Sequence, residues 1–438
     1  MEKEMLQLQQ YISIHPVIDI KEKFRIAYIS LLKYICEKHS KQDQWSQSMI
    51  LLMKEQMMLT RDFLHLEIDE KNRIKEQGKV SILLKYKLHK YRYNILTDCL
   101  FISAFNDKQK GKEILNDMCC LYPRSAKELT RLFDCFYKVD NEIIKNRYIS
   151  LYDIFSIIDK NRKFLSIPEK RIMITANMSA GKSTLLNALA GKKVNKTQND
   201  TCTAKIHYLL NKAGEDTFSY ELDHDLELNA TYEILMDDNE DNISSEIVVG
   251  TRFRSLSEIE NRVCFIDTPG VNSSQNKEHK ELTNEVISDD NCDLLIFLLN
   301  GENIGSDDDA KHLRYVAENY HGDIIFLINK LDKFKKDIDS VSETLKNAHD
   351  DLMKMGYNDP KVYPISAYAA YLAKMVIYGE KLTEDEEDDL NFRKRKLSKE
   401  EFQYYRYYDV EAPLIDETKE DEVLLRNSGI LSLEKIIY

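Results

Sequence analysis

Glycine and proline are scarce in the first third of this chain. The 438-residue sequence has thirteen glycines and seven prolines, and just two of the glycines precede residue 166. Apolar residues recur in that region at three- and four-residue spacing. This period, with so few turn-forming residues, excludes a region of many short strands and predicts helices. We therefore expect an all-helical N-terminal domain over residues 1–165.

Zinc-binding and membrane-spanning patterns are also missing. The eight cysteines form no CxxC pair, and no histidine pair stands at zinc spacing, which favours reduced thiols in a cytosolic protein. The longest strongly apolar run, residues 294–299, is far too short to span a bilayer, and no signal peptide begins the chain. We expect a cytoplasmic protein in which any membrane contact is peripheral.

The chain has no excess of positive charge. Its formal net charge is −13 at pH 7, which disfavours broad binding to nucleic acid. Basic side chains usually solvate a helix face, but a local cluster offers an alternative surface for lipid headgroups or a partner. That cluster consists of Lys79, Lys85, Lys87, His89, Lys90 and Arg92.

The sequence changes character at Pro168. Proline ends a helix, and eleven of the thirteen glycines lie beyond this position. From here apolar strand-like runs alternate with helical patterns, which is typical of a mainly parallel sheet flanked by helices. We expect a second, α/β domain over residues 166–438.

A phosphate-binding loop is predicted after the first strand of this domain. Residues 171–175 are a short β-branched, apolar run, and leucines at helical spacing follow Ser183. Between them the pattern GxxxxGK[ST] begins at Ala176, where alanine replaces the first glycine. Backbone N–H groups of such a loop cradle phosphate oxygens, Lys182 would reach the β- and γ-phosphates, and the Ser183 hydroxyl would ligate Mg²⁺. The nucleotide contacts expected from this loop come from Asn177, Met178, Ser179, Ala180, Gly181, Lys182, Ser183 and Thr184.

The first candidate switch residue is Thr203. It follows Lys182 by 21 residues and precedes an apolar run at 206–210. A threonine in this place can close over Mg²⁺ and the γ-phosphate and release when that phosphate leaves. Thr201 is the second choice.

A second switch is predicted where residues 264–270 form a strand that ends in the sequence DTPG. The Asp267 carboxylate can hold Mg²⁺ through water, and the Gly270 N–H can meet the γ-phosphate. The predicted metal ligands are therefore Ser183, Thr203 and Asp267.

A guanine-recognition motif follows the buried strand predicted at 324–328. The strand ends in the sequence NKLD. The Asp332 carboxylate can accept from both the ring N–H and the exocyclic amine of guanine, a pair that adenine cannot offer. Lys330 would lie along the base, and Asn329 would tie this loop to the phosphate loop. A polar site of this kind rejects the wrong base by about 10⁴ or more, so the motif predicts GTP rather than ATP.

The last motif of the set follows the strand predicted at 361–365. Ser366 and Ala367 stand there, and a backbone N–H of this turn can meet the guanine carbonyl. The motifs occur in the order expected of one nucleotide site, each at a strand end. We therefore predict an α/β P-loop GTPase domain.

This G domain is enlarged and resembles that of the dynamin superfamily. Thr203 and Asp267 stand 64 residues apart, far more than in minimal small GTPases. Together with the SAGKST loop, the Thr-Cys-Thr-Ala run, DTPG followed by Val-Asn-Ser, and the preceding helical region, this spacing is similar to bacterial dynamin-like proteins. The resemblance covers about residues 168–438, and residues 428–434 look like the start of the family's last G-domain helix. It implies hydrolysis of GTP to GDP and phosphate, with Mg²⁺ as cofactor and a homodimer formed through the G domain.

Two positions refine what the resemblance implies. Ser179 matches the loop serine that contacts phosphate and helps to seat K⁺ or Na⁺, so the implied catalytic residues are Ser179, Lys182, Thr203 and Gly270. Met178 stands where dynamin proper has a glutamine that positions the attacking water, and methionine cannot do this.

The chain ends at Tyr438, just after the predicted G domain. We expect a longer protein or a partner protein to supply the stalk that family members use at membranes.

An insertion is predicted at about residues 380–409. It runs from acidic (384–389) through basic (393–396) to aromatic, with Tyr404 and Tyr408 among its tyrosines. We interpret it as a solvated helical hairpin whose tyrosines cover the G domain. A surface for a partner or for self-association is the alternative.

Three functions fit these motifs. The first is a dynamin-like GTPase, activated by dimerisation, that acts at membranes or in a larger assembly. The second is a slow GTP-dependent switch or scaffold that recruits a protein through the helical domain. The third is an Era-like ribosome-assembly GTPase, and the acidic net charge together with the lack of an RNA-binding domain argues against it.

Overall fold

The computed structural model describes residues 6–40, 43–57, 86–177, 179–194, 205–223, 225–237, 246–268, 292–334, 340–411 and 414–438. These residues fold into two compact units. The first consists of Met1–Ser166, Lys212–Tyr220 and Asp225–Asn229. The second consists of Ile167–Asn211, Glu221–His224 and Ala230–Tyr438.

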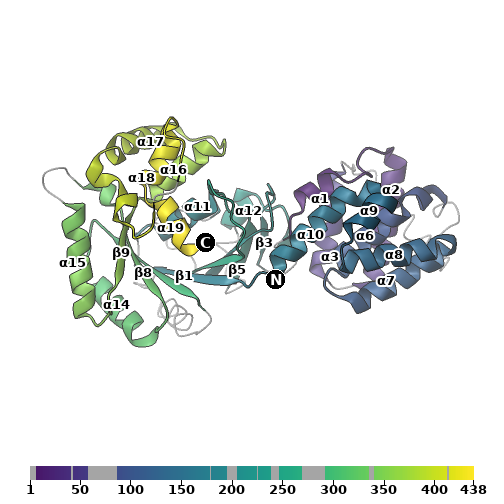
Figure 1. Ribbon diagram of the computed structural model, residues 1–438, viewed down its shortest axis with the longest axis horizontal. Helices are drawn as coiled ribbons and strands as arrows, with labels where there is room; N and C mark the ends of the chain where they lie inside the picture. The colour runs from purple at the N-terminus through teal and green to yellow at the C-terminus, as the bar shows by residue number, and fades with distance from the viewer. Residues whose placement is uncertain are drawn as a thin grey trace. The chain divides into compact units, whose positions relative to one another are not determined.

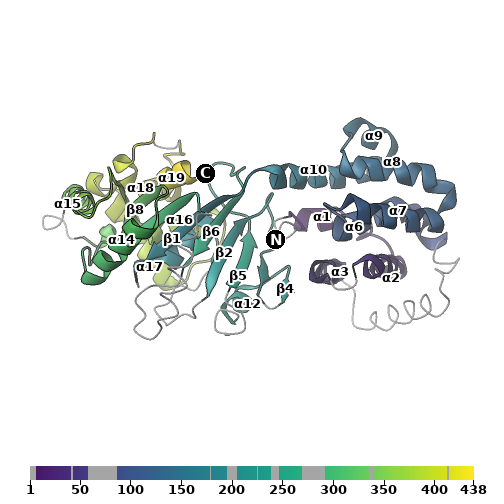
Figure 2. The ribbon, with the colours of Figure 1, turned by 90° about the horizontal axis from the view of Figure 1, so that it is seen from below.

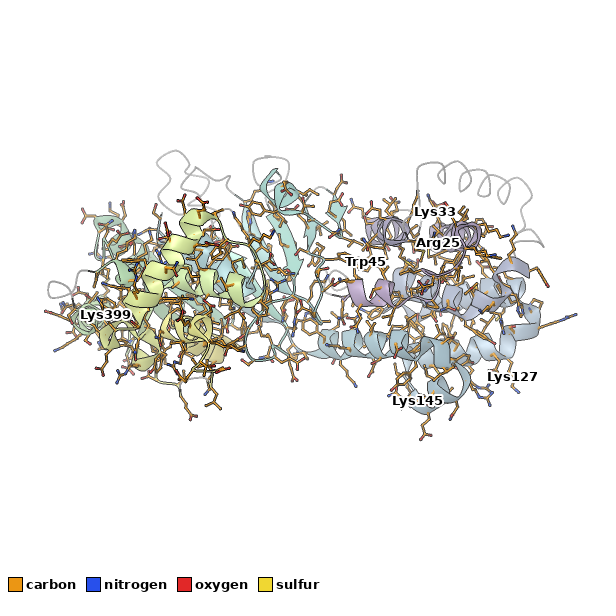
Figure 3. The ribbon with its side chains drawn as sticks, turned by 90° about the horizontal axis from the view of Figure 1, so that it is seen from above. Arg25, Lys33, Trp45, Lys127, Lys145 and Lys399 are labelled. Carbon is orange, nitrogen blue, oxygen red and sulfur yellow. The ribbon has the colours of Figure 1, made fainter. Side chains whose placement is uncertain are left out.

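The first unit is built mainly of helices (Figure 1). Aspartates begin two of them: the Asp107 side chain accepts from the Lys110 N–H at 2.9 Å to cap α7, and Asp140 caps α9 in the same way. Such caps satisfy backbone donors that the first helical turn leaves unpaired. Lys127 and Lys145 project outward from this unit (Figure 3). The α-helices are α1 (Gln9–Ser13), α2 (Glu22–His39), α3 (Gln44–Gln56), α6 (Arg92–Ser103), α7 (Lys108–Leu121), α8 (Ala126–Tyr137), α9 (Asn141–Arg147) and α10 (Tyr152–Ser166).

Helix α6 forms the centre of this unit, and ten of its residues in a row, 94–103, are buried. One of them is Asp98, whose carboxylate accepts from the Tyr11 hydroxyl at 2.7 Å and from the Tyr28 hydroxyl at 2.5 Å. The His15 Nε2 lies 3.1 Å from the same carboxylate. The Val17 N–H donates to His15 Nδ1 at 3.3 Å, on the other side of the ring. A buried carboxylate therefore accepts hydrogen bonds from two tyrosines that stand 17 residues apart in the sequence, and it lies beside a histidine ring.

One piece of the predicted G domain packs instead with the helices. The Gln7 side chain donates to Glu215 O at 2.7 Å, the Leu8 N–H donates to Asp216 Oδ2 at 2.8 Å, and the Gln9 side chain accepts from the Thr217 N–H at 3.0 Å. The boundary predicted at residue 165 did not foresee this exchange. Its physical reason is that residues 215–217 satisfy polar groups of residues 7–9.

The second unit is organised around strands in the order β5-β2-β6-β1-β7-β8-β9, which form most of a nine-stranded sheet that continues through β3 and β4. Figure 2 shows β1, β6, β2 and β5 side by side. Strand β1 pairs in parallel with β6 and β7, and β8 pairs in parallel with β7 and β9, whereas β2 runs antiparallel to β6. The predicted mainly parallel sheet is confirmed. The strands are β1 (Lys170–Ala176), β2 (Ile206–Asn211), β3 (Tyr220–Leu222), β4 (Leu226–Glu227), β5 (Glu246–Thr251), β6 (Val263–Asp267), β7 (Leu294–Asn300), β8 (Ile324–Asn329) and β9 (Lys361–Ile365).

Helices cover both faces of this sheet. Helices α11, α16, α18 and α19 pack together on one face, and α14 and α15 lie on the other (Figure 1). The central strands are buried along almost their whole length, as expected of parallel strands covered on two faces. The α-helices are α11 (Lys182–Ala190), α12 (Tyr232–Asp237), α14 (Asp307–Asn319), α15 (Val341–Lys354), α16 (Ala367–Ile377), α17 (Glu384–Leu397), α18 (Glu420–Asn427) and α19 (Ile430–Ile437). Among the described residues, no helix is both long and apolar enough to cross a bilayer.

The predicted insertion folds as α17 followed by two short 3₁₀ helices, Glu400–Phe402 and Tyr404–Tyr407. A capping box between Thr383 and Glu386 fixes the start of α17. Tyr404 and Tyr408 are buried in the core of the second unit, and the Tyr408 ring stacks on Tyr363 with centroids 4.5 Å apart. These two tyrosines cover the domain, as expected from the sequence.

Candidate functional site

The loop between β1 and α11 has the backbone of an anion-binding turn. Ser179 and Gly181 have positive φ values of 61° and 96°, and no side chain caps the N-terminus of α11. A Cβ at Gly181 would collide with the Asn329 side-chain nitrogen, so this position requires glycine for space as well as for conformation. Ala176, at the end of β1, is not among the residues with positive φ, so alanine is accepted there. The uncapped N–H groups of the first turn, from Lys182 onward, are available to an anion.

The loop lysine meets the carboxylate at the end of β6. Lys182 Nζ lies 2.5 Å from Asp267 Oδ1, and both side chains are largely buried. The parallel register of β1 and β6 pairs Ile174 with Asp267, which brings the strand end beside the loop. Ser183 stands in the first turn of α11. Hydroxyl and carboxylate oxygens are the ligands that Mg²⁺ prefers, so these residues fit the predicted metal site.

The strand end at β8 is bonded to the phosphate loop. The buried Asn329 side chain donates to Ala180 O at 2.8 Å, and Lys330 Nζ donates to Ser179 O at 2.6 Å. Lys330 has a positive φ of 69°, and burial lowers the pKa of its ammonium group, with Lys333 acting in the same direction. Two segments about 150 residues apart in the sequence therefore share one site.

The turn after β9 is engaged within the protein. The Ser366 N–H donates to Ser428 O at 2.9 Å, and the Ala367 N–H donates to Asn329 Oδ1 at 3.1 Å. The predicted contact of this turn with a guanine carbonyl would therefore require the Ala367 amide to share or leave its bond to Asn329. The Ser366 hydroxyl is buried, and no donor or acceptor in the described part of the chain meets it.

Asp332 lies in the short 3₁₀ helix Leu331–Lys333 and is 4% exposed. Its partner is Arg393 of α17, whose Nε lies 3.4 Å from Asp332 Oδ2. The sequence analysis placed Arg393 in a solvated basic run, and this was wrong, because Arg393 is 8% exposed. The missed signal is helical spacing: Arg393 stands between Leu390 and Leu397, the other two buried positions of α17.

One of the predicted contact residues is engaged elsewhere, and four predicted residues cannot be placed. The Asn177 side chain donates to the Asp309 carboxylate of α14, so an internal partner already holds it. Asp309 also marks the start of α14, where its N–H donates to the Ser306 hydroxyl. The predicted site residues Met178, Thr201, Thr203 and Gly270 lie outside the described residues.

His207 is a site neighbour that the sequence analysis missed. The antiparallel register of β2 and β6 sets it opposite Asp267. Burial lowers the pKa of its ring below the ordinary value, although the Asp267 carboxylate acts in the opposite sense. The available signal was a histidine in the strand that follows the predicted switch threonine. Just before it, Lys205 forms a buried ion pair with Asp223 at 3.2 Å, which anchors the start of β2.

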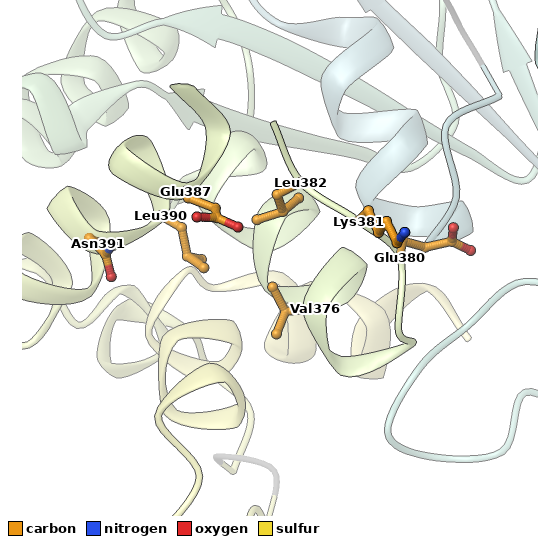
Figure 4. A pocket seen from close by; sticks show the side chains of 7 residues that line it. All are labelled: Val376, Glu380, Lys381, Leu382, Glu387, Leu390 and Asn391. Atoms are coloured by element: carbon orange, nitrogen blue, oxygen red, sulfur yellow. The ribbon is translucent and has the colours of Figure 1, made fainter. Parts of the chain in front are cut away.

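A hollow of about 540 Å³ lies away from these loops, beside the end of α16 and the start of α17 (Figure 4). None of the predicted nucleotide-binding residues lines it. Its walls are Val376, Glu380, Lys381, Leu382, Glu387, Leu390 and Asn391. The candidate nucleotide site is therefore the cluster of loops at the strand ends, and the hollow is separate from it.

Comparison with solved structures found distant similarities. Era of Aquifex aeolicus bound to GDP·AlF₄⁻ is 18% identical with a TM-score of 0.28, and the match covers 49% of this chain and 58% of that one. The G domain of the FeoB iron transporter of T. maritima is 15% identical with a TM-score of 0.27 and coverages of 51% and 99%. A structure described as an oligomerised bacterial dynamin pair is 17% identical with a TM-score of 0.38 and coverages of 95% and 62%. The chain thus spans less than two thirds of the Era and dynamin structures.

Comparison with curated proteins found no match. The family model described as the Dynamin family matches residues 172–331. This range begins in β1 and ends at the start of the guanine-recognition turn, so it includes the phosphate loop, Asp267 and Asn329. Residues 172–331, most of which lie in the second unit, are therefore similar to the dynamin family, with the fold of a P-loop GTPase domain.

Proposed function

We propose that the protein binds GTP with Mg²⁺ and hydrolyses it to GDP and phosphate. The observation that carries this proposal is the pair of bonds from Asn329 and Lys330 to the phosphate loop. They join the loop after β1 to the turn after β8, which supports a single site for phosphate and guanine. A fold-level likeness alone would support no such function, because folds of this class host many activities.

The phosphate end of the site would bind the triphosphate and the metal. Lys182 would exchange its ion pair with Asp267 for the β- and γ-phosphates, while the loop amides cradle the oxygens. Asp267 would then be released to hold Mg²⁺ together with the Ser183 hydroxyl and Thr203. The metal would neutralise charge that develops on the phosphates. Gly270 would meet the γ-phosphate, and Ser179 would help to seat K⁺ or Na⁺.

The base end would select guanine. Asp332 would accept from the ring N–H and the exocyclic amine, and the Lys330 side chain would lie along the base on its way to Ser179 O. A base that lacks either donor would leave the buried carboxylate without a hydrogen bond. This cost is the physical basis of discrimination against bases other than guanine. Ser366 and Ala367 would border the guanine carbonyl.

We further propose that two G domains pair during turnover and that the protein works at membranes or in a larger assembly. The match of residues 172–331 to the dynamin family model supports this part. The exposed residues Lys87, His89 and Lys90 are available to anionic headgroups. A cytoplasmic location with peripheral membrane contact agrees with the sequence.

The test is GTP hydrolysis per molecule measured over a range of protein concentrations, with Mg²⁺ and K⁺ present. Turnover should rise with concentration, and Lys182→Ala should lower kcat by about 10²-fold or more because a charge-stabilising donor is removed. Lys311→Ala, an exposed lysine on α14, is the matched control. Flat, unmeasurable turnover at high protein concentration would contradict the proposal.

A second candidate is a slow switch or scaffold, favoured by Met178 in place of the glutamine that positions water. It predicts slow hydrolysis together with partner binding through the helical unit that depends on GTP. Co-sedimentation with liposomes in GTP, in GDP and without nucleotide separates the two. Vesicle binding that responds to nucleotide favours the membrane function, and partner capture indifferent to nucleotide contradicts the switch.

A further inference from the structure

The predicted guanine-reading carboxylate has a cationic neighbour that belongs to none of the nucleotide motifs. Arg393 comes from α17, in the insertion, and reaches the turn that follows β8. Its side chain is 9% exposed, and its Nε is buried without a hydrogen-bond partner in the described part of the chain. Burying an arginine is costly unless its charge is compensated, so this placement requires an explanation.

Three contacts hold the guanidinium in place. One terminal nitrogen lies 2.7 Å from Asp389 Oδ1, one helical turn earlier. The group also lies over the Tyr368 ring, 4.5 Å from its centroid, in the cation–π position. The third contact is the approach of Nε to Asp332 Oδ2 at 3.4 Å, an ion pair too long to be a strong hydrogen bond. Asp389 and Tyr368 therefore fix Arg393, and Asp332 receives its charge without losing an acceptor position.

The Asp332 carboxylate can therefore still accept hydrogen bonds from a ligand. No hydrogen-bond donor reaches its carboxylate within the described ranges, and its one ion pair there is with Arg393. An ionised carboxylate has about four lone-pair directions, and guanine needs two of them. The Arg393 charge can thus offset the cost of burying Asp332 while both oxygens remain able to accept.

We propose that Arg393 is a positioning residue of the guanine site, which orients Asp332 and compensates its charge so that the base can be read. This inference rests on the proposed function and deepens it. It makes the insertion part of the base pocket, because α17 supplies the cation and Tyr368 of α16 supplies the surface that carries it. An arginine that blocked the pocket would need a direct hydrogen bond to Asp332 and freedom to leave, and the contacts to Asp389 and Tyr368 oppose both.

The experiment compares GDP with IDP, which lacks the exocyclic amine, by isothermal titration of the full chain. In the wild type GDP should bind about tenfold or more tightly than IDP, because a hydrogen bond to a charged acceptor is lost. Arg393→Ala should weaken GDP by about tenfold and reduce the GDP-to-IDP ratio towards one. Arg393→Lys should restore part of the ratio, and Arg395→Ala, an exposed neighbour on α17, should leave it unchanged.

The GDP-to-IDP affinity ratio separates a positioning role of Arg393 from general damage to the pocket, because a distorted pocket would weaken the binding of both nucleotides equally. In an Asp332→Ala background the Arg393 substitution should have no further effect on the ratio. An unchanged ratio in Arg393→Ala, or tighter GDP binding, would overturn this inference while leaving the proposed function intact. Failure of the wild type to bind GDP at all would overturn the proposed function itself. Circular dichroism of Arg393→Ala and Arg393→Lys checks that both variants fold.

Discussion

Asp98 in the helical unit and Asp332 in the GTPase unit are both buried carboxylates, with 0% and 4% of their surface exposed. Two tyrosine hydroxyls donate to Asp98 at 2.7 and 2.5 Å, and a histidine nitrogen lies 3.1 Å away. Asp332 has one cation at 3.4 Å and, in the described part of the chain, no hydrogen-bond donor. The two residues have the same chemistry but very different surroundings.

We interpret this difference as that between a structural carboxylate and one proposed to bind a ligand. A buried carboxylate whose two oxygens already accept hydrogen bonds from side chains of the fold joins segments of that fold. A buried carboxylate whose charge is balanced by a cation, but whose oxygens accept no hydrogen bond, can still accept hydrogen bonds from a ligand. Three comparisons test this interpretation, from the largest expected effect to the smallest.

The largest effect is expected at Asp98. Asp98→Ala leaves two buried hydroxyls and a histidine without an acceptor, so it should lower the free energy of unfolding by about 3–5 kcal/mol. Urea denaturation followed by circular dichroism measures this. Asp134→Ala, at an exposed position of α8, is the control and should change stability by less than about 0.5 kcal/mol. Equal midpoints for the two variants would show that the Asp98 cluster is dispensable.

The sequence predicted the architecture of the second unit because its motifs are local. The strand before the phosphate loop, the loop itself and the following helix are adjacent in the chain, and residues 171–191 contain all of them. The antiparallel pairing of β2 with β6 is not local, because it depends on how the chain between them returns. The apolar period and the composition of a segment predict a strand, but they do not predict the direction in which that strand runs in the sheet.

The second effect is expected at Asp332 and concerns binding. Asp332→Ala should weaken GDP binding by about 10²-fold, since two hydrogen bonds to a charged acceptor are lost. Stability should change by less than about 1 kcal/mol, because Arg393 keeps its pair with Asp389. Titration calorimetry and thermal melting measure the two quantities. A large loss of stability with intact GDP binding would make Asp332 resemble Asp98 and remove the contrast.

Contacts made by residues outside the motifs could not be predicted. Arg393 lies 61 residues after Asp332, in a run whose charges suggested solvent. Its burial depends on the packing of α17 against the turn after β8, which composition does not reveal. The Asp98 cluster is hidden for the same reason, because Tyr11 and Tyr28 resemble ordinary core aromatics until the fold brings them to one carboxylate. Polar partners that are distant in sequence are thus the part that requires the structure.

The smallest effect is expected from removal of one hydroxyl group in each unit. Tyr28 donates to Asp98, whereas the Tyr404 hydroxyl is buried with no hydrogen-bond partner among the described residues. Tyr28→Phe should lower the free energy of unfolding by about 2 kcal/mol, because a hydrogen bond to a charged group is lost. Tyr404→Phe removes a polar group that nothing satisfies, so it should be neutral or slightly stabilising. Urea denaturation at pH 7 compares the two variants.

Alkaline denaturation sharpens this last comparison. Burial, and next the Asp98 charge, raises the pKa of Tyr28, and burial, and next the Asp332 charge, raises that of Tyr404. The unfolded tyrosines ionise near pH 10, so the folded state of the wild type loses stability as pH rises above about 10. Each phenylalanine variant removes one such group and should lose less stability than the wild type in that range. If both variants lose stability similarly at high pH but only Tyr28→Phe is less stable than the wild type at pH 7, the loss at pH 7 is due to the Asp98 hydrogen bond. If both variants lose equal stability at pH 7, the loss is due to packing.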